Sequence, residues 1–106
     1  MKFAVMGVFK VLETESTKFK EDLIWHSENT WQESGSLKFV VYVDENDSSV
    51  FYLYELFEDR SDYEKHIKTD YISVFKEKIT PLLREPVQIF RGVPAFSNPK
   101  SKKGEI

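Results

Sequence analysis

Few residues in this chain are suited to acid–base chemistry, and His66 is the first of them. It lies in the segment EKHIKTDY, three positions after Tyr63 and one before Ile67, at the edge of an apolar helix face. Imidazole titrates near neutral pH, so a histidine at the rim of an aromatic cavity can act as a general base or a hydrogen-bond donor. The structural alternative is a half-buried histidine bonded to a carbonyl or to Glu55, and the residues alone favour it.

Glu55 is a carboxylate inside the aromatic segment VFYLYELF. Buried carboxylates are rare unless a partner neutralises them or hydrogen-bonds to them. Glu55 therefore either pairs with a lysine or with His66, or it polarises a group of a bound ligand. The residues favour the structural pairing and leave the ligand role open.

His26 and Trp25 lie on the first predicted helix. His26 is near the boundary of the apolar stripe and has no second ligand at a spacing such as H-x-x-x-H, so we expect no metal site. Trp25 lies on the side away from Phe19 and Leu23, as an exposed ring or as an anchor at a protein contact. The chain has no cysteine, no nucleophile-elbow motif and no glycine-rich phosphate loop, which argues against thiolate, serine-triad and nucleotide sites.

Composition indicates one globular domain over residues 1–96, followed by a disordered tail over 97–106. Hydrophobic residues make up 41% and charged residues 31% of the 106 positions, which is too apolar for a disordered chain. The net charge of −3, without a basic stripe, argues against nucleic-acid binding. No apolar run approaches the ~18 residues that span a bilayer. We expect a cytoplasmic protein, and the lack of cysteine is compatible with a reducing compartment.

The elements that must position these residues follow the order β-α-β-β-α-β, which is the ferredoxin-like arrangement with a four-stranded antiparallel sheet. The class is α+β. A turn over 45–48 joins the second and third strands as a hairpin. The predicted strands span 3–12, 36–44, 49–57 and 87–93, and the predicted helices span 16–32 and Ser61 to just before Pro81.

Three helix boundaries carry specific signals. Gly35 suits the left-handed residue after a helix. Ser61 and Glu64 have the spacing of a capping box that opens the second helix. Thr69 and Asp70 could cap a helix again, so we expect the second helix to be broken there.

The middle strands are apolar on both faces, unlike the strands of a sheet with one face in water. Two helices can cover only one face of four strands. The other face then needs a partner, and a symmetric homodimer is the commonest solution. We expect the dimer to form through the sheet face that bears Tyr42, Tyr52 and Tyr54.

Three segments, in this order and at this spacing, resemble the antibiotic-biosynthesis-monooxygenase family of small dimeric α+β barrels. They are ESGSLKF at 33–39, YELFED at 54–59 and HIKTDYI at 66–72, and the resemblance covers residues 3–93. The chain departs from the family at three positions: Ser36 replaces a common cysteine, Phe57 a tryptophan and Tyr71 a histidine. The haem-degrading branch is least similar, because the first strand has no asparagine.

The resemblance implies a cofactor-independent monooxygenase that oxidises a small quinol or phenol with molecular oxygen. A deprotonated quinol can itself reduce oxygen, so we expect no haem, flavin or metal. In this interpretation His66 is the catalytic base, in an aromatic cavity between sheet and helices. Tyr71 and Glu55 would bind the substrate and orient its oxygen atoms. The walls of the cavity would be formed by Phe51, Leu53 and Phe57.

Two other functions stay open. An isomerase or other acid–base catalyst of a small polar metabolite would need a cationic group that faces the cavity. A non-catalytic dimer that binds a small molecule is the third interpretation, because a fold and a cavity do not make an enzyme.

Overall fold

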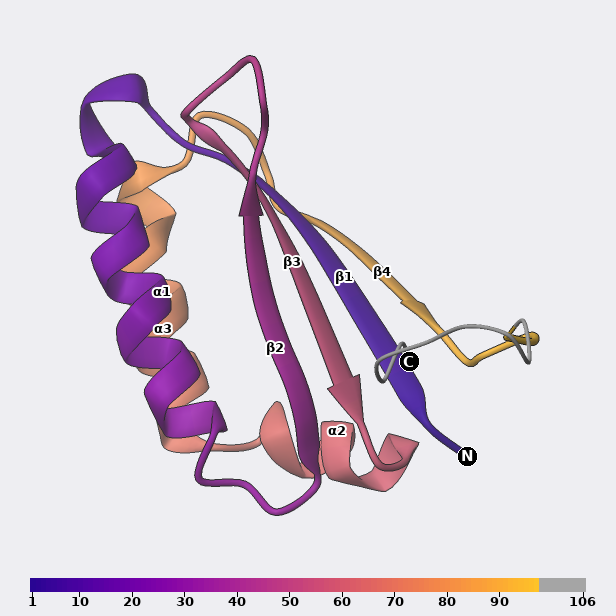
Figure 1. The fold of residues 1–106 in the computed structure, drawn as a ribbon. Coiled ribbons are helices and arrows are strands. Elements are labelled where there is room, and N and C mark those ends of the chain that lie inside the picture. The colour runs from indigo at the N-terminus through magenta and orange to yellow at the C-terminus, as the bar shows by residue number, and fades with distance from the viewer. Residues whose placement is uncertain (98–106) are drawn as a thin grey trace.

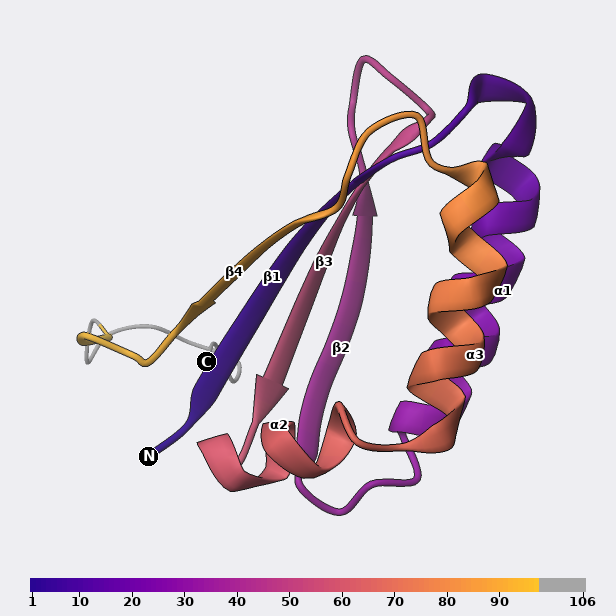
Figure 2. The ribbon, with the colours of Figure 1, turned by 180° about the vertical axis from the view of Figure 1, so that it is seen from behind.

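The computed structural model describes residues 1–97, so the expected disordered tail lies almost entirely outside the described residues. One layer is an antiparallel sheet and the other is a pair of helices, α1 and α3, which lie side by side across one sheet face (Figures 1 and 2). The strands are β1 (Phe3–Lys10), β2 (Ser36–Val43), β3 (Val50–Phe57) and β4 (Gln88–Gly92), and the helices are α1 (Ser16–Thr30), α2 (Arg60–His66) and α3 (Asp70–Ile79). Short 3₁₀ turns precede α1 at Glu13–Glu15 and follow α3 at Thr80–Leu82.

The sheet confirms the predicted ferredoxin-like topology. Its strand order is β2-β3-β1-β4, and all neighbours are antiparallel. In this register Val5 of β1 lies between Glu55 of β3 and Arg91 of β4. Because directly opposed residues share a face of the sheet, these three side chains lie in one row beneath the helices.

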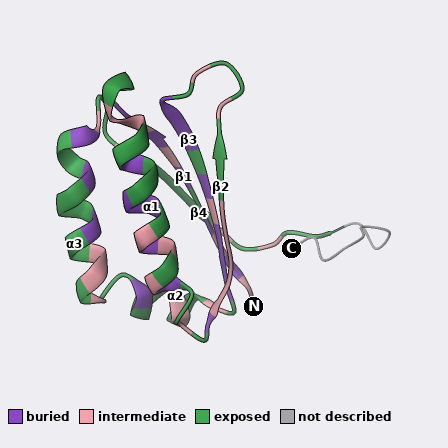
Figure 3. Ribbon diagram, turned by 60° about the vertical axis from the view of Figure 1, so that its left-hand side comes forward, coloured by how far each residue is buried: buried purple, intermediate pink, exposed green. Residues whose placement is uncertain are grey.

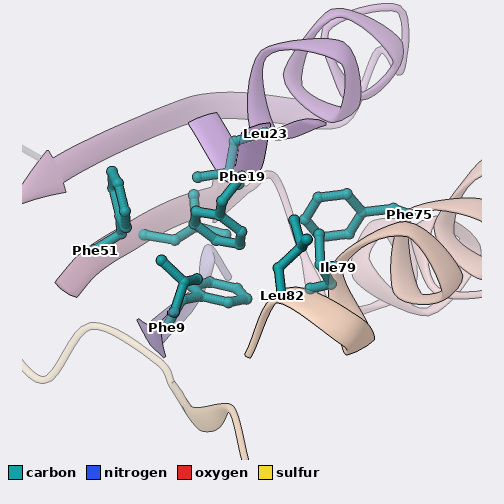
Figure 4. Close-up of a cluster of buried hydrophobic side chains, with 9 residues drawn as sticks. Phe9, Phe19, Leu23, Phe51, Phe75, Ile79 and Leu82 are labelled. Carbon is teal, nitrogen blue, oxygen red and sulfur yellow. The ribbon is translucent and has the colours of Figure 1, made fainter. Parts of the chain in front are cut away.

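Rings and aliphatic side chains from α1, α3 and the sheet meet in one core between the two layers (Figure 4). Phe19 of α1 lies at the centre, with its ring centroid 5.0 Å from that of Phe51 and 5.3 Å from that of Phe9. Each such buried side chain contributes about 1.5–3 kcal/mol through its burial. The remaining labelled members of this cluster are Leu23, Phe75, Ile79 and Leu82.

The second helix is broken as predicted, but its first cap differs from the prediction. Thr69 is the N-cap of α3, which confirms the expected break. The predicted capping box of Ser61 and Glu64 is wrong, because Asp59 caps α2 and its carboxylate accepts from the Asp62 N–H at 3.1 Å. A carboxylate at this position also interacts favourably with the helix dipole, and it outcompetes the serine two residues later.

Gly35 has a different role from the predicted one. The first helix ends at Thr30, and the φ angle of Gly35 lies outside the left-handed region, so the predicted helix-terminating role is wrong. A Cβ atom at position 35 would instead overlap the side chain of Asp62. The Gly35 carbonyl also accepts from the Glu58 N–H at 2.8 Å. This close approach holds the loop after α1 against the start of α2.

The helices leave one face of the sheet uncovered (Figure 3). Large apolar side chains lie exposed on this face. Tyr42 is 57% exposed there and Tyr52 is 38% exposed, while Tyr54 is half-buried. The prediction that the two helices cover only one sheet face is therefore confirmed. Among the described helices, none is both long and apolar enough to cross a bilayer.

Candidate functional site

A cavity of about 270 Å³ lies between the sheet and the helices, at the end where α2 and α3 meet. Its apolar wall includes Leu53, Phe75, Ile79 and Ile89, and its polar groups are His26, Glu55, His66, Lys76 and Arg91. Protein cavities that hold drug-sized ligands measure roughly 300–1,000 Å³, so this one suits a small molecule.

His66, the last residue of α2, is almost completely buried beside this cavity. Its Nδ1–H donates to Oε2 of Glu33 at 2.8 Å. The Tyr71 hydroxyl lies 3.1 Å from the same Nδ1 atom and donates to Glu33. A carboxylate on one ring nitrogen fixes the orientation of the ring and its tautomer. The other nitrogen, Nε2, is left to face Glu55, whose Oε1 atom is 3.8 Å away.

Glu55 is buried on β3, and its Oε1 atom has no hydrogen-bond partner among the described residues. Burial raises the pKa of the Glu55 carboxyl to about 8, and the negative charge of Glu33 adds to this shift. A carboxyl with this pKa is largely protonated at neutral pH, so it can donate a hydrogen bond to an oxygen atom in the cavity.

His26 is the site residue that the sequence analysis underestimated. Its ring is buried and stacks on Phe75, with ring centroids 4.1 Å apart. Burial, together with a smaller contribution from the nearby His66, lowers the pKa of His26 to about 3. The sequence signal for this burial is the spacing of Phe19, Leu23 and His26, which places all three on one face of the helix.

Glu33 was also missed as a site residue. It belongs to the first motif of the family resemblance, yet nothing in its own neighbourhood predicts a contact with His66, 33 positions away. The loop that follows α1 brings the carboxylate there, because Gly35 lets this loop pack against Asp62.

The structure gathers some of the predicted site residues and separates others. His66, Glu55 and Leu53 line one cavity, as expected. Tyr71 contacts His66 on the Glu33 side of the ring and is not part of the cavity wall.

The two predicted phenylalanine walls lie elsewhere. Phe57 is fully buried among Phe3, Val5 and Tyr63, with its ring 5.4 Å from that of His66, so it supports the imidazole from the side. Phe51 packs on Phe19 and borders a separate groove between α1 and β2. Their alternation in β3 placed both on the correct face, but the position along the strand decides which cavity a residue lines.

Trp25 is neither fully exposed nor free of contacts. It packs against the core, and the Lys78 ammonium lies 3.9 Å from the centroid of its ring. This cation–π contact joins α1 to α3.

The cavity combines groups for proton transfer with groups that attract negative charge. His66 Nε2 and Glu55 face each other across 3.8 Å, and a substrate oxygen between them could give a proton to the imidazole. Lys76 and Arg91 line the same cavity. Their positive charges would favour an anion bound there.

A family model described as antibiotic biosynthesis monooxygenase matches residues 2–78, which is most of the chain. This match confirms the resemblance predicted from the three sequence motifs. Among curated proteins, none matches the sequence significantly.

Solved structures share the fold over nearly the whole described chain. A Nitrosomonas europaea protein, provisionally described as an antibiotic biosynthesis monooxygenase, has a TM-score of 0.84 at 20% identity, over 90% of this chain and 91% of that one. Rv0793 from Mycobacterium tuberculosis has a TM-score of 0.85 at 18% identity, over 92% and 98%. PA3566 from Pseudomonas aeruginosa has a TM-score of 0.81 at 20% identity, over 90% and 95%. These identities establish the fold, and the match to the family model establishes the family: the chain belongs to the antibiotic biosynthesis monooxygenase family.

Proposed function

We propose that the protein is a cofactor-independent monooxygenase that oxidises a small quinol or phenol. One observation carries this proposal: His66 is held by Glu33 at Nδ1, while Nε2 points into a mostly apolar cavity. A base fixed in this way can accept a phenolic proton without rotating first.

In this reaction the substrate hydroxyl transfers its proton to His66 Nε2, and the Glu55 carboxyl donates a hydrogen bond to the resulting oxyanion. The electron-rich anion reduces molecular oxygen, and a carbon–oxygen bond forms. One oxygen atom stays in the product, and the other leaves as water with two hydrogens from the substrate. Such a reaction draws its electrons from the substrate itself.

The substrate class follows from the size and lining of the cavity. A cavity of about 270 Å³ with Leu53, Phe75 and Ile89 in its wall favours one or two fused rings over a larger polycyclic compound. Arg91 lies in the same row of side chains as Val5 and Glu55. Its positive charge would attract the phenolate form of the substrate.

We also propose that the working unit is a cytoplasmic homodimer. The open sheet face presents Tyr42, Tyr52 and Phe90, each more than one-third exposed. Monomeric proteins rarely keep such a patch in water, and a two-fold axis would bury it against its own copy.

Oxygen consumption with a panel of small quinols tests this function. The reaction is run with protein treated with a chelator, and the product is checked by mass spectrometry for one added oxygen atom from ¹⁸O₂. Lys65→Ala, an exposed change next to His66, is the control for general effects of substitution in α2. Absence of oxygen uptake across the panel, with a folded dimer, would contradict the proposal.

A second function is favoured by Lys76 and Arg91, the cationic groups in the cavity wall. An acid–base catalyst such as an isomerase needs cationic groups that face the cavity, and these two residues could bind a small anionic carbonyl compound. His66 would then move a proton next to the carbonyl. Proton exchange into D₂O, followed by NMR without oxygen, detects this activity, and Arg91→Met should reduce it.

A further inference from the structure

Two histidines and one carboxylate converge on one point of the cavity wall from three separate elements. His26 comes from α1, Glu55 from β3 and His66 from the end of α2. Each offers one potential ligand atom, and these three atoms all lie within 4.8 Å of one another. All three side chains are at least nine-tenths buried.

Two of these residues carry polar atoms that nothing in the described protein satisfies. Glu55 Oε1 and His26 Nδ1 are both buried and lack a hydrogen-bond partner among residues 1–97. A buried polar atom without a partner costs roughly 1–3 kcal/mol, so such atoms usually have a ligand, ion or water. Both residues line the same cavity.

His66 already has the arrangement of a metal-binding histidine. Such a residue presents one ring nitrogen to the ion and donates the other N–H to a carboxylate or carbonyl. Here Nδ1–H donates to Glu33 at 2.8 Å, and Nε2 faces Glu55 Oε1 at 3.8 Å. The Tyr71 hydroxyl donates to Glu33 as well, so the supporting carboxylate is itself held in place.

We propose that His26, Glu55 and His66 form a binding site for a divalent transition-metal ion, with Glu33 as the positioning residue for His66. Two imidazoles and one carboxylate suit zinc, iron, cobalt, nickel or copper, whereas calcium and magnesium prefer all-oxygen sites. Three protein ligands leave a coordination position open to the cavity.

The separations show how the site would respond to an ion. Zinc binds nitrogen and oxygen at about 2.0–2.2 Å, which puts the ligand atoms about 3.3 Å apart in a tetrahedron. The three ligand atoms lie within 4.8 Å of one another, and His66 Nε2 is 3.8 Å from Glu55 Oε1, so binding would draw the side chains inward. His26 Nδ1 and Glu55 Oε1 have no hydrogen-bond partner among the described residues. No hydrogen bond at these atoms has to break when the side chains move towards an ion.

This inference goes beyond the proposed monooxygenase function and departs from the expectation of no metal site. That expectation rested on the spacing of ligands along one helix. Such a spacing cannot indicate a site whose ligands come from three separate elements. A metal ion on His66 Nε2 would occupy the lone pair that the cofactor-independent reaction uses. Zinc should therefore inhibit that reaction, and a metal-bound form would be a second state of the same cavity.

Zinc binding to chelator-treated full chain tests the site without any assay of activity. Isothermal titration calorimetry and elemental analysis after dialysis should give one Zn²⁺ per chain. The expected Kd is about 10 µM or tighter, which corresponds to a binding free energy of about −7 kcal/mol. Co²⁺ should bind with the intense visible absorption of a four- or five-coordinate ion.

The matched variants are Glu55→Gln, which keeps the shape and removes the charge, and His26→Phe, which keeps the stack on Phe75 and removes the ligand. Each should weaken Zn²⁺ binding at least 10-fold, and Glu33→Gln should weaken it about 10-fold to 100-fold. Glu45→Gln, at an exposed position of the hairpin, is the control and should change nothing. Circular dichroism confirms that each variant folds.

Two results would overturn the proposal. One is Zn²⁺ binding weaker than 1 mM, or absent, in the wild-type protein. The other is stoichiometric binding that persists in Glu55→Gln and His26→Phe. If a variant fails to fold, the Co²⁺ spectrum of the wild type still decides, because an octahedral spectrum excludes this buried three-ligand site. Lack of oxygenase activity affects only the proposed function and leaves this test unchanged.

Discussion

Oε2 of Glu33 lies 2.8 Å from Nδ1 of His66, which joins the loop after α1 to the last residue of α2. This contact fixes the imidazole before any substrate arrives. It also leaves Nε2 as the ring atom that faces Glu55 and the cavity. The orientation of one ring therefore depends on a carboxylate from a distant part of the sequence.

Replacing Glu33 tests this dependence. Glu33→Gln keeps an acceptor oxygen but removes the charge that stabilises the imidazolium. We expect kcat for oxygen uptake to fall by about 10-fold to 100-fold. Glu28→Gln, on an exposed turn of α1, is the matched control. An unchanged kcat would mean that Glu33 only packs the loop.

Gly35 should be needed for the geometry of this loop. A Cβ atom at position 35 meets the side chain of Asp62, whereas one at Gly92 meets nothing within 4 Å. We therefore expect Gly35→Ala to lower the free energy of unfolding by about 1–3 kcal/mol, the usual cost of overpacking. Gly92→Ala should leave it nearly unchanged. Chemical denaturation of the two variants makes the comparison, and equal stabilities would contradict the role assigned to Gly35.

The stability of the metal-free protein should fall between pH 6.5 and 8. Burial raises the pKa of Glu55 from 4.5 to about 8, so the folded state holds a proton that the unfolded state has released. Stability from this group is fully present below pH 4.5 and is lost as pH rises through about 8, with a slope of at most about 1.4 kcal/mol per pH unit. The lowered pKa of His26 acts in the opposite direction, between about pH 3 and 6.5, and so does not contribute to this alkaline decline.

Glu55→Gln is the control for that pH dependence, since an amide cannot titrate. Urea unfolding at half-unit pH steps should show the decline in the wild type and a flatter curve in the variant. If both curves have the same slope above pH 6.5, Glu55 is not protonated in the folded state.

The open face of the sheet should mediate dimerisation. Light scattering at micromolar concentration is expected to give roughly twice the 12.5 kDa chain mass. Tyr42→Lys places a charge on this face and should shift the protein towards a monomer. Val74→Lys adds the same charge at an exposed position of α3 and should leave the mass unchanged. A monomeric wild-type protein of normal solubility would exclude this interface.

The strands, the helices and the broken second helix could be predicted because local patterns determine them. Alternation in VFYLYELF gives a strand with Leu53 and Glu55 on the inner face, and Thr69 occupies the N-cap position of α3. The sheet order follows from the β-α-β-β-α-β order. The cap of α2 was misassigned because Asp59 and Ser61 both offer an N-cap oxygen, and the structure shows that the helix begins after Asp59.

The composition of the site was harder to predict, since it depends on how elements pack. Phe51 and Leu53 alternate correctly on one face, yet only Leu53 lines the cavity, because α1 covers the strand at Phe51. His26 was placed at the edge of its helix stripe, although α3 in fact covers it with Phe75. Glu33 lies in a loop, and no periodic pattern predicts where a loop carboxylate points.

The role of His66 is best tested with a variant that keeps the contact with Glu33. A histidine at the edge of the core, with one hydrogen bond, would contribute only about 1 kcal/mol of stability. The nearly complete burial of His66 means that His66→Ala would also leave a cavity and would remove one of the two hydrogen bonds to Glu33. His66→Asn is better, since its amide N–H lies near the position of Nδ1 and can still donate to Glu33, while Nε2 is lost.

Oxygen consumption by wild type, His66→Asn and the Lys65→Ala control, at a saturating concentration of a quinol that the wild type oxidises, is therefore the most direct measurement. If His66 Nε2 is the general base, His66→Asn keeps a near-normal melting temperature and loses about 10²–10⁴ in kcat, while Lys65→Ala keeps both. Turnover at the wild-type rate by folded His66→Asn would show that His66 is not the base.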